Sequence, residues 1–353
     1  MNATPAGQAP GRVPLSILDL VPVWQGGSIK EAFEASLALA VAADRAGYAR
    51  LWYAEHHNAL PFASPATALL IGRAAEHTTR IRLGAGGVML PNHSPLLVAE
   101  YYGTLAEMHP GRIDLGLGRA PGTDPLTARA LRRGVETTDS FVHDVVELHR
   151  YLAPDPSPAQ GQEAAVGRRP VRAYPGAGTA VPLWMLGSSL DGAQVAAVLG
   201  LPYVFASHFA PKLRHEAIGL YRQQFRADLE TAAIAAPWLM AGVNVLVAPT
   251  DEEAAHLFTT HQQMAAMIRT GQRSPLAPPV ADLAAALGGE LAAYIERGMP
   301  VSAVGSPGTV VARLEQIVAD LDLDEVIITT YTHDPALRVR SFELLATAWG
   351  CQN

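Results

Sequence analysis

Cysteine is almost absent from this chain of 353 residues, because Cys351 near the C-terminal end is its only one. No disulfide can form within the chain, so nothing suggests an oxidising compartment. Long hydrophobic runs are also missing, since stretches such as Leu37–Ala43 are far shorter than the ~18 residues of a membrane-spanning helix. The first dozen residues contain no apolar segment typical of a signal peptide. These absences predict a soluble, cytoplasmic protein with no membrane partner.

Charge is scarce as well, and blocks of Lys or Arg are missing. Charged residues make up 17% of the chain and the net charge is −7, which predicts no nucleic-acid partner. Hydrophobic residues make up 49%, a share that suits a large buried core with little disorder. We therefore expect a single domain over residues 1–353, with an ordered core at about 14–348.

What the chain does contain is an apolar strand followed by an amphipathic helix, repeated eight times. This alternation predicts an α/β protein whose parallel sheet closes into a (β/α)8 TIM barrel, whereas an open doubly wound sheet would need no eighth strand. Two excursions rich in Pro, Gly and Ala, near 153–181 and 271–300, are expected to be irregular. The eight strands are expected at 15–23, 50–54, 81–87, 113–117, 183–186, 203–206, 238–247 and 325–330.

Several helix boundaries carry capping signals. Ser28 with Glu31, and Thr250 with Glu253, have the spacing of a capping box, and Gly47 is expected to end the first helix in a left-handed conformation. A Ser-Pro pair supplies a capping hydroxyl and a proline at the first helical position. Such pairs are expected to open a helix at three places: Ser64, Ser94 and Ser306.

Unusual polar residues stand where the expected strands end, and in a TIM barrel all these ends lie on the face that carries the active site. Arg119 follows the fourth strand; a phosphate is a natural partner for its planar guanidinium, with a salt bridge to Asp124 or Asp139 as the alternative. Gly187, Ser188 and Ser189 precede a helix whose free N–H groups favour an anion. An ordinary N-cap serine is the alternative there.

The second strand ends at Glu55, His56 and His57. Adjacent side chains of a strand point to opposite faces, so the two histidines are expected to differ in role, and a purely structural role for both stays open. The sequence contains no His-x-His on a strand and no His-Glu-x-x-His on a helix, so no metal site is predicted.

Two enzyme classes lack their motifs. Gly84–Met89 has no third glycine at the spacing of a dinucleotide fingerprint, and Gly116–Gly122 runs into a turn where that fingerprint needs a helix. No serine stands in a G-x-S-x-G motif, and the one cysteine is terminal. We therefore expect no NAD(P)H site of the Rossmann type and no nucleophilic hydrolysis.

Four of these segments, in this order and spacing, resemble the luciferase-like flavin monooxygenase family, which includes the α subunit of bacterial luciferase. The resemblance covers about residues 14–348. It implies a (β/α)8 barrel that binds FMN at the C-terminal ends of its strands. The segments that carry it are Trp52–His57, Gly84–Pro91, Gly111–Arg119 and Val304–Pro307.

The resemblance also implies roles for single residues. His56 matches the family's catalytic histidine near the reactive edge of the flavin, and Arg119 matches an arginine that holds the FMN phosphate. Gly86 and Gly87 fall where luciferase has a non-proline cis peptide bond beneath the flavin ring. The remaining cofactor-binding residues implied are Glu55 and the phosphate cradle of Gly187, Ser188 and Ser189.

The implied activity is that of an FMN-dependent monooxygenase. Reduced FMN would react with O2 to give a C4a-(hydro)peroxyflavin that oxidises a small, fairly apolar organic substrate. An apolar barrel mouth that includes Trp24, Val88 and Met89, with a closing loop in the 271–300 stretch, would exclude water. The missing dinucleotide motif fits reduced FMN supplied by a separate NAD(P)H:flavin reductase. Family resemblance favours a homodimer formed through barrel-side helices.

Three alternatives remain open at this stage. A sibling enzyme would use the deazaflavin F420 for hydride transfer and consume no oxygen. A non-catalytic flavin-binding subunit would have no need of His56, Arg119 and the Gly187–Ser188 pair together. A metal-dependent hydrolase on the same barrel is the least favoured, for want of ligands.

Overall fold

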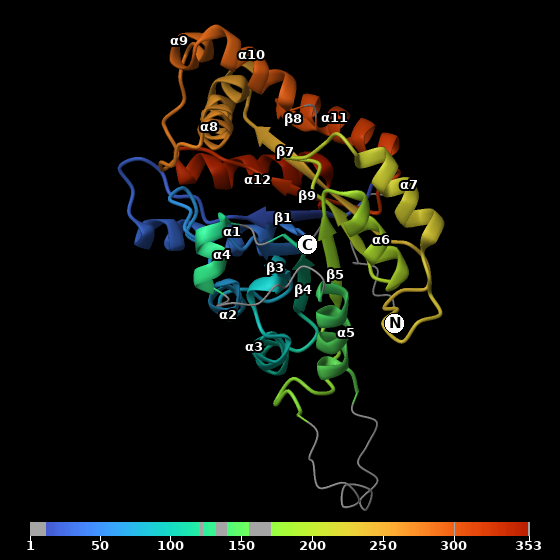
Figure 1. The fold of residues 1–353 in the computed structure, drawn as a ribbon. Helices are drawn as coiled ribbons and strands as arrows, with labels where there is room; N and C mark the ends of the chain where they lie inside the picture. The colour runs from blue at the N-terminus through green and yellow to red at the C-terminus, as the bar shows by residue number, and fades with distance from the viewer. Residues whose placement is uncertain (1–11, 121–122, 132–139, 155–170, 300, 352–353) are drawn as a thin grey trace, which may run out of the picture.

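Eight parallel strands close into a barrel, which confirms the predicted fold (Figure 1). The computed structural model describes residues 12–120, 123–131, 140–154, 171–299 and 301–351. Neighbours around the ring follow the chain, and β9 closes it by pairing with β1. The barrel strands are β1 Leu15–Asp19, β2 Arg50–Tyr53, β3 Arg82–Met89, β4 Ile113–Gly118, β5 Leu183–Gly187, β6 Tyr203–Phe205, β7 Leu239–Val247 and β9 Glu325–Thr329.

Helices surround this ring (Figure 1), and each helix of the alternating units except α4 (Pro125–Leu131) has buried residues. Within the described residues, no helix combines the length and apolar character needed to cross a bilayer. The helices of the alternating units are α1 Ile29–Ala46, α2 Thr67–Glu76, α3 Pro95–Met108, α4 Pro125–Leu131, α5 Phe141–Leu152, α6 Leu190–Val198, α7 Arg214–Gln224, α8 Asp251–Thr270, α11 Pro307–Leu321 and α12 Pro335–Trp349.

The expectation of an irregular 271–300 stretch is wrong, because this stretch contains α9 (Leu283–Leu287) and α10 (Gly289–Gly298). Both pack against α8, and α10 buries Ala292 and Ile295 one turn apart. The flanking glycines and prolines concealed this short apolar stripe. A ninth strand, β8 (Ser302–Gly305), was also missed; it pairs with β7 beyond the part of β7 that pairs with β6. Most of the 153–181 excursion, residues 155–170, lies outside the described residues.

The capping signals were right in part. Ser28 and Glu31 form the expected capping box, and Gly47 ends α1 with φ of 84°. Helices α3 and α11 begin at the proline of their Ser-Pro pairs, but neither serine hydroxyl caps its helix. At Ser64 the prediction is wrong, because α2 begins only at Thr67, whose hydroxyl meets Tyr102 Oη at 3.0 Å. In α3 and α11 the proline is therefore enough to start the helix without a serine cap, since its fixed φ suits the first helical turn.

Four charged residues form an ionic layer at the beginning of the strands. We call this layer the barrel floor; its members are Arg50, Arg82, Asp114 and Glu325. Arg50 lies 2.8 Å from Asp114 and 3.0 Å from Glu325, and neither carboxylate is exposed. Burial raises the pKa of Asp114, but Arg50 and Arg82 outweigh this effect and hold it below its usual value. The indole N–H of Trp52 donates to the same carboxylate at 3.2 Å.

Candidate functional site

The sheet register brings Arg119 and Gly187 to one place at the C-terminal rim of the barrel. Gly118 at the end of β4 pairs with Leu186 of β5, so the next residues of the two strands are neighbours. Arg119 Nη2 lies 3.0 Å from Asp191 Oδ2 in the first turn of α6. The ion-pair alternative thus has a partner among the described residues, Asp191. Asp124 pairs with Arg273 instead, and Asp139 lies outside the described residues. A guanidinium has five N–H groups, so this contact leaves donors for a phosphate.

After β5 the backbone at Gly187 passes close to the backbone at Gly192 in α6. A Cβ on Gly187 would lie 3.3 Å from Gly192 Cα and 3.4 Å from Tyr203 Oη, so glycine fits best there. Ser189 Oγ accepts from Gly192 N at 3.3 Å and caps α6, as the N-cap alternative expected. Ser188 is partly buried between them. Phosphate binding by this segment would therefore rest on backbone N–H groups and Ser188 more than on the Ser189 hydroxyl.

The peptide bond between Gly86 and Gly87 is cis, which confirms what the resemblance implied for this position. It lies in β3, where the pairing with β4 shifts between Ala85 and Val88. A Cβ on Gly86 would come within 2.6 Å of Leu18, and one on Gly87 within 2.7 Å of the Gly116 carbonyl oxygen. Close packing on both sides therefore leaves room for glycine only.

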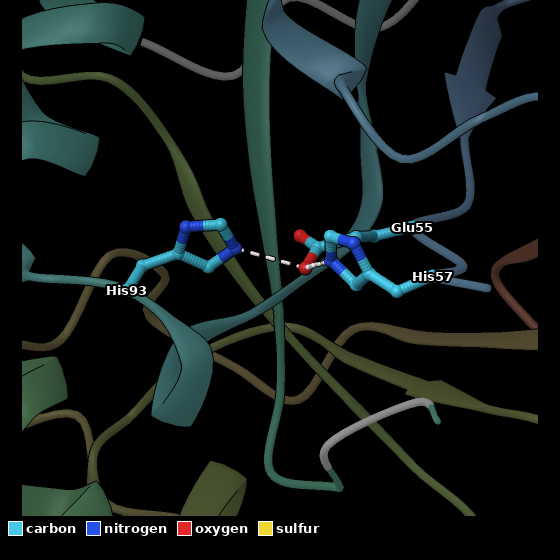
Figure 2. A group of neighbouring side chains, drawn as sticks. All are labelled: Glu55, His57 and His93. Atoms are coloured by element: carbon cyan, nitrogen blue, oxygen red, sulfur yellow. Dashed lines mark hydrogen bonds and ion pairs between the residues drawn. The ribbon is translucent and has the colours of Figure 1, made fainter. Parts of the chain in front are cut away.

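Glu55 is buried between two imidazoles that donate to it from opposite sides, as Figure 2 shows. His57 Nε2 and His93 Nε2 lie 2.7 and 2.8 Å from Glu55 Oε1, and Met89 N donates to Oε2 at 3.1 Å. Burial alone would raise the pKa of this carboxyl, but the hydrogen bonds from His57 and His93 outweigh that effect and bring the pKa down to about 2. Glu55 therefore stays ionised and joins the segment after β2 to the segment after β3.

This group, the Glu55 triad (Glu55, His57 and His93), has the donor atoms of a metal site. In a tetrahedral zinc site with bonds of about 2.0–2.1 Å, ligand atoms lie about 3.3 Å apart. The N–O separations of 2.7 and 2.8 Å are shorter and match N–H to carboxylate hydrogen bonds. We therefore interpret the triad as hydrogen-bonded. The sequence search missed His93 because it stands 36 residues beyond His57, after the next strand.

His56 belongs to a different group from its neighbour, as the strand alternation predicts. Its ring centroid lies 5.4 Å from that of Phe62, which in turn lies 6.1 Å from Tyr331 after β9. The charge of His56 also lowers the pKa of His208, which follows β6, and His208 acts in the same way on His261 of α8. Phe62, Tyr331, His208 and His261 were not predicted, because only the closed barrel brings these segments together.

Burial keeps two of these imidazoles neutral. The pKa of His208 falls to about 4, through burial first and His56 second, and the pKa of His261 falls to about 3, through burial and then His208. His261 is 6% exposed and packs its ring 4.8 Å from Tyr331.

The two neutral imidazoles should make the free energy of unfolding depend on pH. Histidines of the unfolded chain take up protons near pH 6.5, whereas these two resist protonation until about 4 and about 3. The unfolded state binds more protons in that interval, so stability should fall as the pH is lowered from 6.5 toward 4. Above pH 6.5 they should contribute no slope. Urea unfolding at a series of pH values measures this, and His261→Gln should flatten the profile; an unchanged slope would contradict the assignment.

Comparison with known proteins places this chain in a family. The model of the luciferase-like monooxygenase family matches residues 13–324. A protein of Escherichia coli K12 named luciferase-like monooxygenase is 43% identical, over 94% of this chain and 96% of its own. The crystal structure of apo-MsnO8 superposes with a TM-score of 0.82 at 33% identity, covering 97% of this chain and 99% of that chain. The fold and the comparisons define an oxidoreductase with a TIM-barrel fold. The chain belongs to the luciferase-like monooxygenase family.

More distant structures share the fold alone. The oxygenating constituent of 3,6-diketocamphane monooxygenase of Pseudomonas putida, in complex with FMN, gives a TM-score of 0.68 at 18% identity, covering 96% of this chain and 98% of that chain. An F420-dependent secondary alcohol dehydrogenase gives 0.67 at 14%, covering 97% and 100%. The barrel thus occurs with both flavin types, and the choice between them depends on the residues of each site.

Proposed function

We propose that this protein is an FMN-dependent monooxygenase that oxidises a small organic substrate with O2. The observation that carries the proposal is the order of residues along four neighbouring strands. His56 follows β2, the cis Gly86–Gly87 bond lies in β3, Arg119 follows β4, and Gly187 ends β5. We call this row the flavin arc. It offers a phosphate site at one end and an imidazole at the other, joined by a glycine surface on which a planar ring can lie.

Each part of the flavin arc has a task in this proposal. Bound reduced FMN supplies two electrons to O2, so that one oxygen atom enters the substrate and the other leaves as water. Arg119 and the backbone at Gly187 would hold the phosphate. His56 would hold or transfer a proton beside the reacting atoms. Water would be excluded by Val88, which is buried, and by Trp24, whose segment pairs with buried Leu276 beyond α8.

Removal of the Arg119 side chain should weaken FMN binding. A charge-assisted hydrogen bond contributes about 1.5–3 kcal/mol, so the Kd of Arg119→Ala should rise by roughly ten- to a hundredfold. Asp191→Asn is the matched variant: it removes the competing carboxylate, and its Kd should not rise. Fluorescence titration with FMN measures both. An unchanged Kd in Arg119→Ala would contradict the phosphate assignment.

Loss of the His56 imidazole should uncouple the reaction while FMN still binds. General acid or base catalysis contributes about 100-fold or more to a rate. We therefore expect His56→Ala to release hydrogen peroxide faster after O2 is admitted to protein loaded with reduced FMN. The exposed His215 of α7 supplies the control variant, His215→Ala, which should behave as wild type. Peroxide release equal to wild type would remove His56 from catalysis.

The decisive experiment loads the protein with FMNH2 without oxygen, admits O2 and follows oxygen consumption together with the flavin absorbance. An F420 enzyme, the second candidate, would bind the deazaflavin and consume no oxygen; the similarity of its fold supports keeping it in the test. A non-catalytic flavin-binding subunit would show neither reaction. Supply of reduced FMN by a separate flavin reductase, a homodimer and a cytoplasmic location stay predictions, which coupled assays, light scattering and fractionation can test.

A further inference from the structure

The side of the barrel mouth that faces the flavin arc carries its own group of side chains. His208 follows β6, His261 lies on α8, Tyr331 follows β9, and Phe62 closes the gap to His56. We call His208, His261, Tyr331 and Phe62 the imidazole wall. The proposed function gives no task to this wall, although the ring of Phe62, with its centroid 5.4 Å from that of His56, places it beside the flavin arc.

The position of His208 is built into the barrel. A Cβ on Gly242 of β7 would lie only 2.0 Å from His208 Nδ1, so glycine is required for the ring to sit there. Asn244 Nδ2 donates to the His208 carbonyl oxygen at 2.7 Å and fixes the backbone. Among the described residues, the buried Nδ1 of His208 has no hydrogen-bond partner. Nδ1 is enclosed against Gly242 while the residue is only partly buried, so a ligand would meet the ring at its other nitrogen, Nε2.

The residues packed around the imidazole wall are aromatic or aliphatic. His261 packs its ring 5.1 Å from Phe258 and 4.8 Å from Tyr331, and Tyr331 belongs to the same buried apolar cluster as Met240, Met264 and Leu276. Within the part of the chain that the structure describes, no ion pair includes His208 or His261. A neutral imidazole offers one donor and one acceptor and no charge. The wall is therefore suited to one hydrogen bond in apolar surroundings.

We propose that the imidazole wall is the substrate subsite, and that it selects an uncharged organic molecule with one hydrogen-bonding heteroatom, such as an amide, a ketone or an alcohol. A carboxylate would need a cation as partner and an amine would need an anion, and burial of either charge without a partner is costly. The heteroatom binds to His208 or His261, and the apolar body packs on Phe62 and Tyr331. This inference rests on the proposed function and adds the substrate class.

Two probes of equal shape and different charge test it: 4-(methylthio)benzamide, which is neutral, and 4-(methylthio)benzoate, which is anionic. Their affinities are measured at pH 7.5 by equilibrium dialysis against wild-type protein with and without FMN. The amide should bind FMN-loaded protein at least about tenfold more tightly than the benzoate. Equal affinity for the two probes, or binding of neither to FMN-loaded protein, overturns the proposal. Failure to bind FMN itself would instead be a failure of the proposed function.

Variants of the two histidines separate recognition from structure. His208→Leu and His261→Leu remove the hydrogen-bonding atoms, and at least one of them should lose the preference for the amide. His208→Gln keeps a donor and an acceptor and should retain it. His256→Leu changes an exposed histidine of the same helix, α8, and is the matched control for His261. FMN affinity and the circular dichroism spectrum are recorded for every variant. Full preference for the amide in both leucine variants would remove the histidines from the subsite.

Discussion

Replacement of Asp114 by alanine is expected to lower the free energy of unfolding by about 3–5 kcal/mol, the cost of breaking a buried ion pair from one side. The carboxylate is fully buried and accepts from Arg50, Arg82 and the indole of Trp52. Without it, Glu325 would be the one counterion left to Arg50 among the described residues, and Arg82 would lose its ion pair with Asp114. The barrel floor would then contain charge that burial penalises.

Urea unfolding followed by circular dichroism measures this loss as a shift of the midpoint. Asp228→Ala is the control, because Asp228 forms an ion pair with Arg226 on the surface and both side chains are mostly exposed. Its midpoint should equal that of wild type. If Asp114→Ala also unfolded at the wild-type midpoint, the floor would not hold the barrel together in the way described.

The second large effect is expected at Glu55, which holds together the two rim segments that follow β2 and β3. In Glu55→Ala the two imidazoles and the Met89 amide lose their shared acceptor, and the segment that carries His56 is no longer fixed to the segment after β3. A misplacement of about 1 Å in a site can reduce a rate about 100-fold. We expect a loss of that size in the oxygenation rate, with a much smaller change in FMN affinity.

Stopped-flow oxygenation and FMN titration separate these two quantities. Glu55→Gln keeps one carbonyl oxygen as an acceptor for an imidazole and should lose less than the alanine variant. Glu34→Ala removes an exposed carboxylate paired with Arg73 and serves as the control. A Glu55→Ala protein with full activity and a native circular dichroism spectrum would show that the triad does not position the site.

The fold could be predicted to a large extent because a barrel strand and its helix carry separate periodic signals. Strand β4, expected at 113–117, is observed at Ile113–Gly118. Strand β8 and helix α10 were missed because each is short and is stabilised by contacts with β7 or α8, which a local pattern does not contain.

The functional site also contains residues that the sequence could predict and residues that it could not. In the flavin arc, His56, Arg119 and Gly187 could be predicted because they stand at or just after a strand end, and the barrel rule brings strand ends together. Gly86 and Gly87 lie inside β3 and were found through the family resemblance. His93, His208 and His261 could not, since one follows a short 3-10 turn, one a three-residue strand, and one lies inside a helix. Their partners are chosen by tertiary packing. Asp191, the partner of Arg119, was missed because it belongs to the first turn of α6 rather than to a strand end.

Trp52 has a wider importance than its place in the apolar interior suggests. Its indole N–H reaches Asp114, while its Cβ and ring would meet any side chain added at Gly86, at 3.1–3.2 Å. The rigid side chain of Trp52 thus connects the barrel floor with the glycine surface on which the flavin ring is proposed to lie. Any substitution at position 52 should therefore disturb both the stability of the barrel and the surface beneath the proposed flavin.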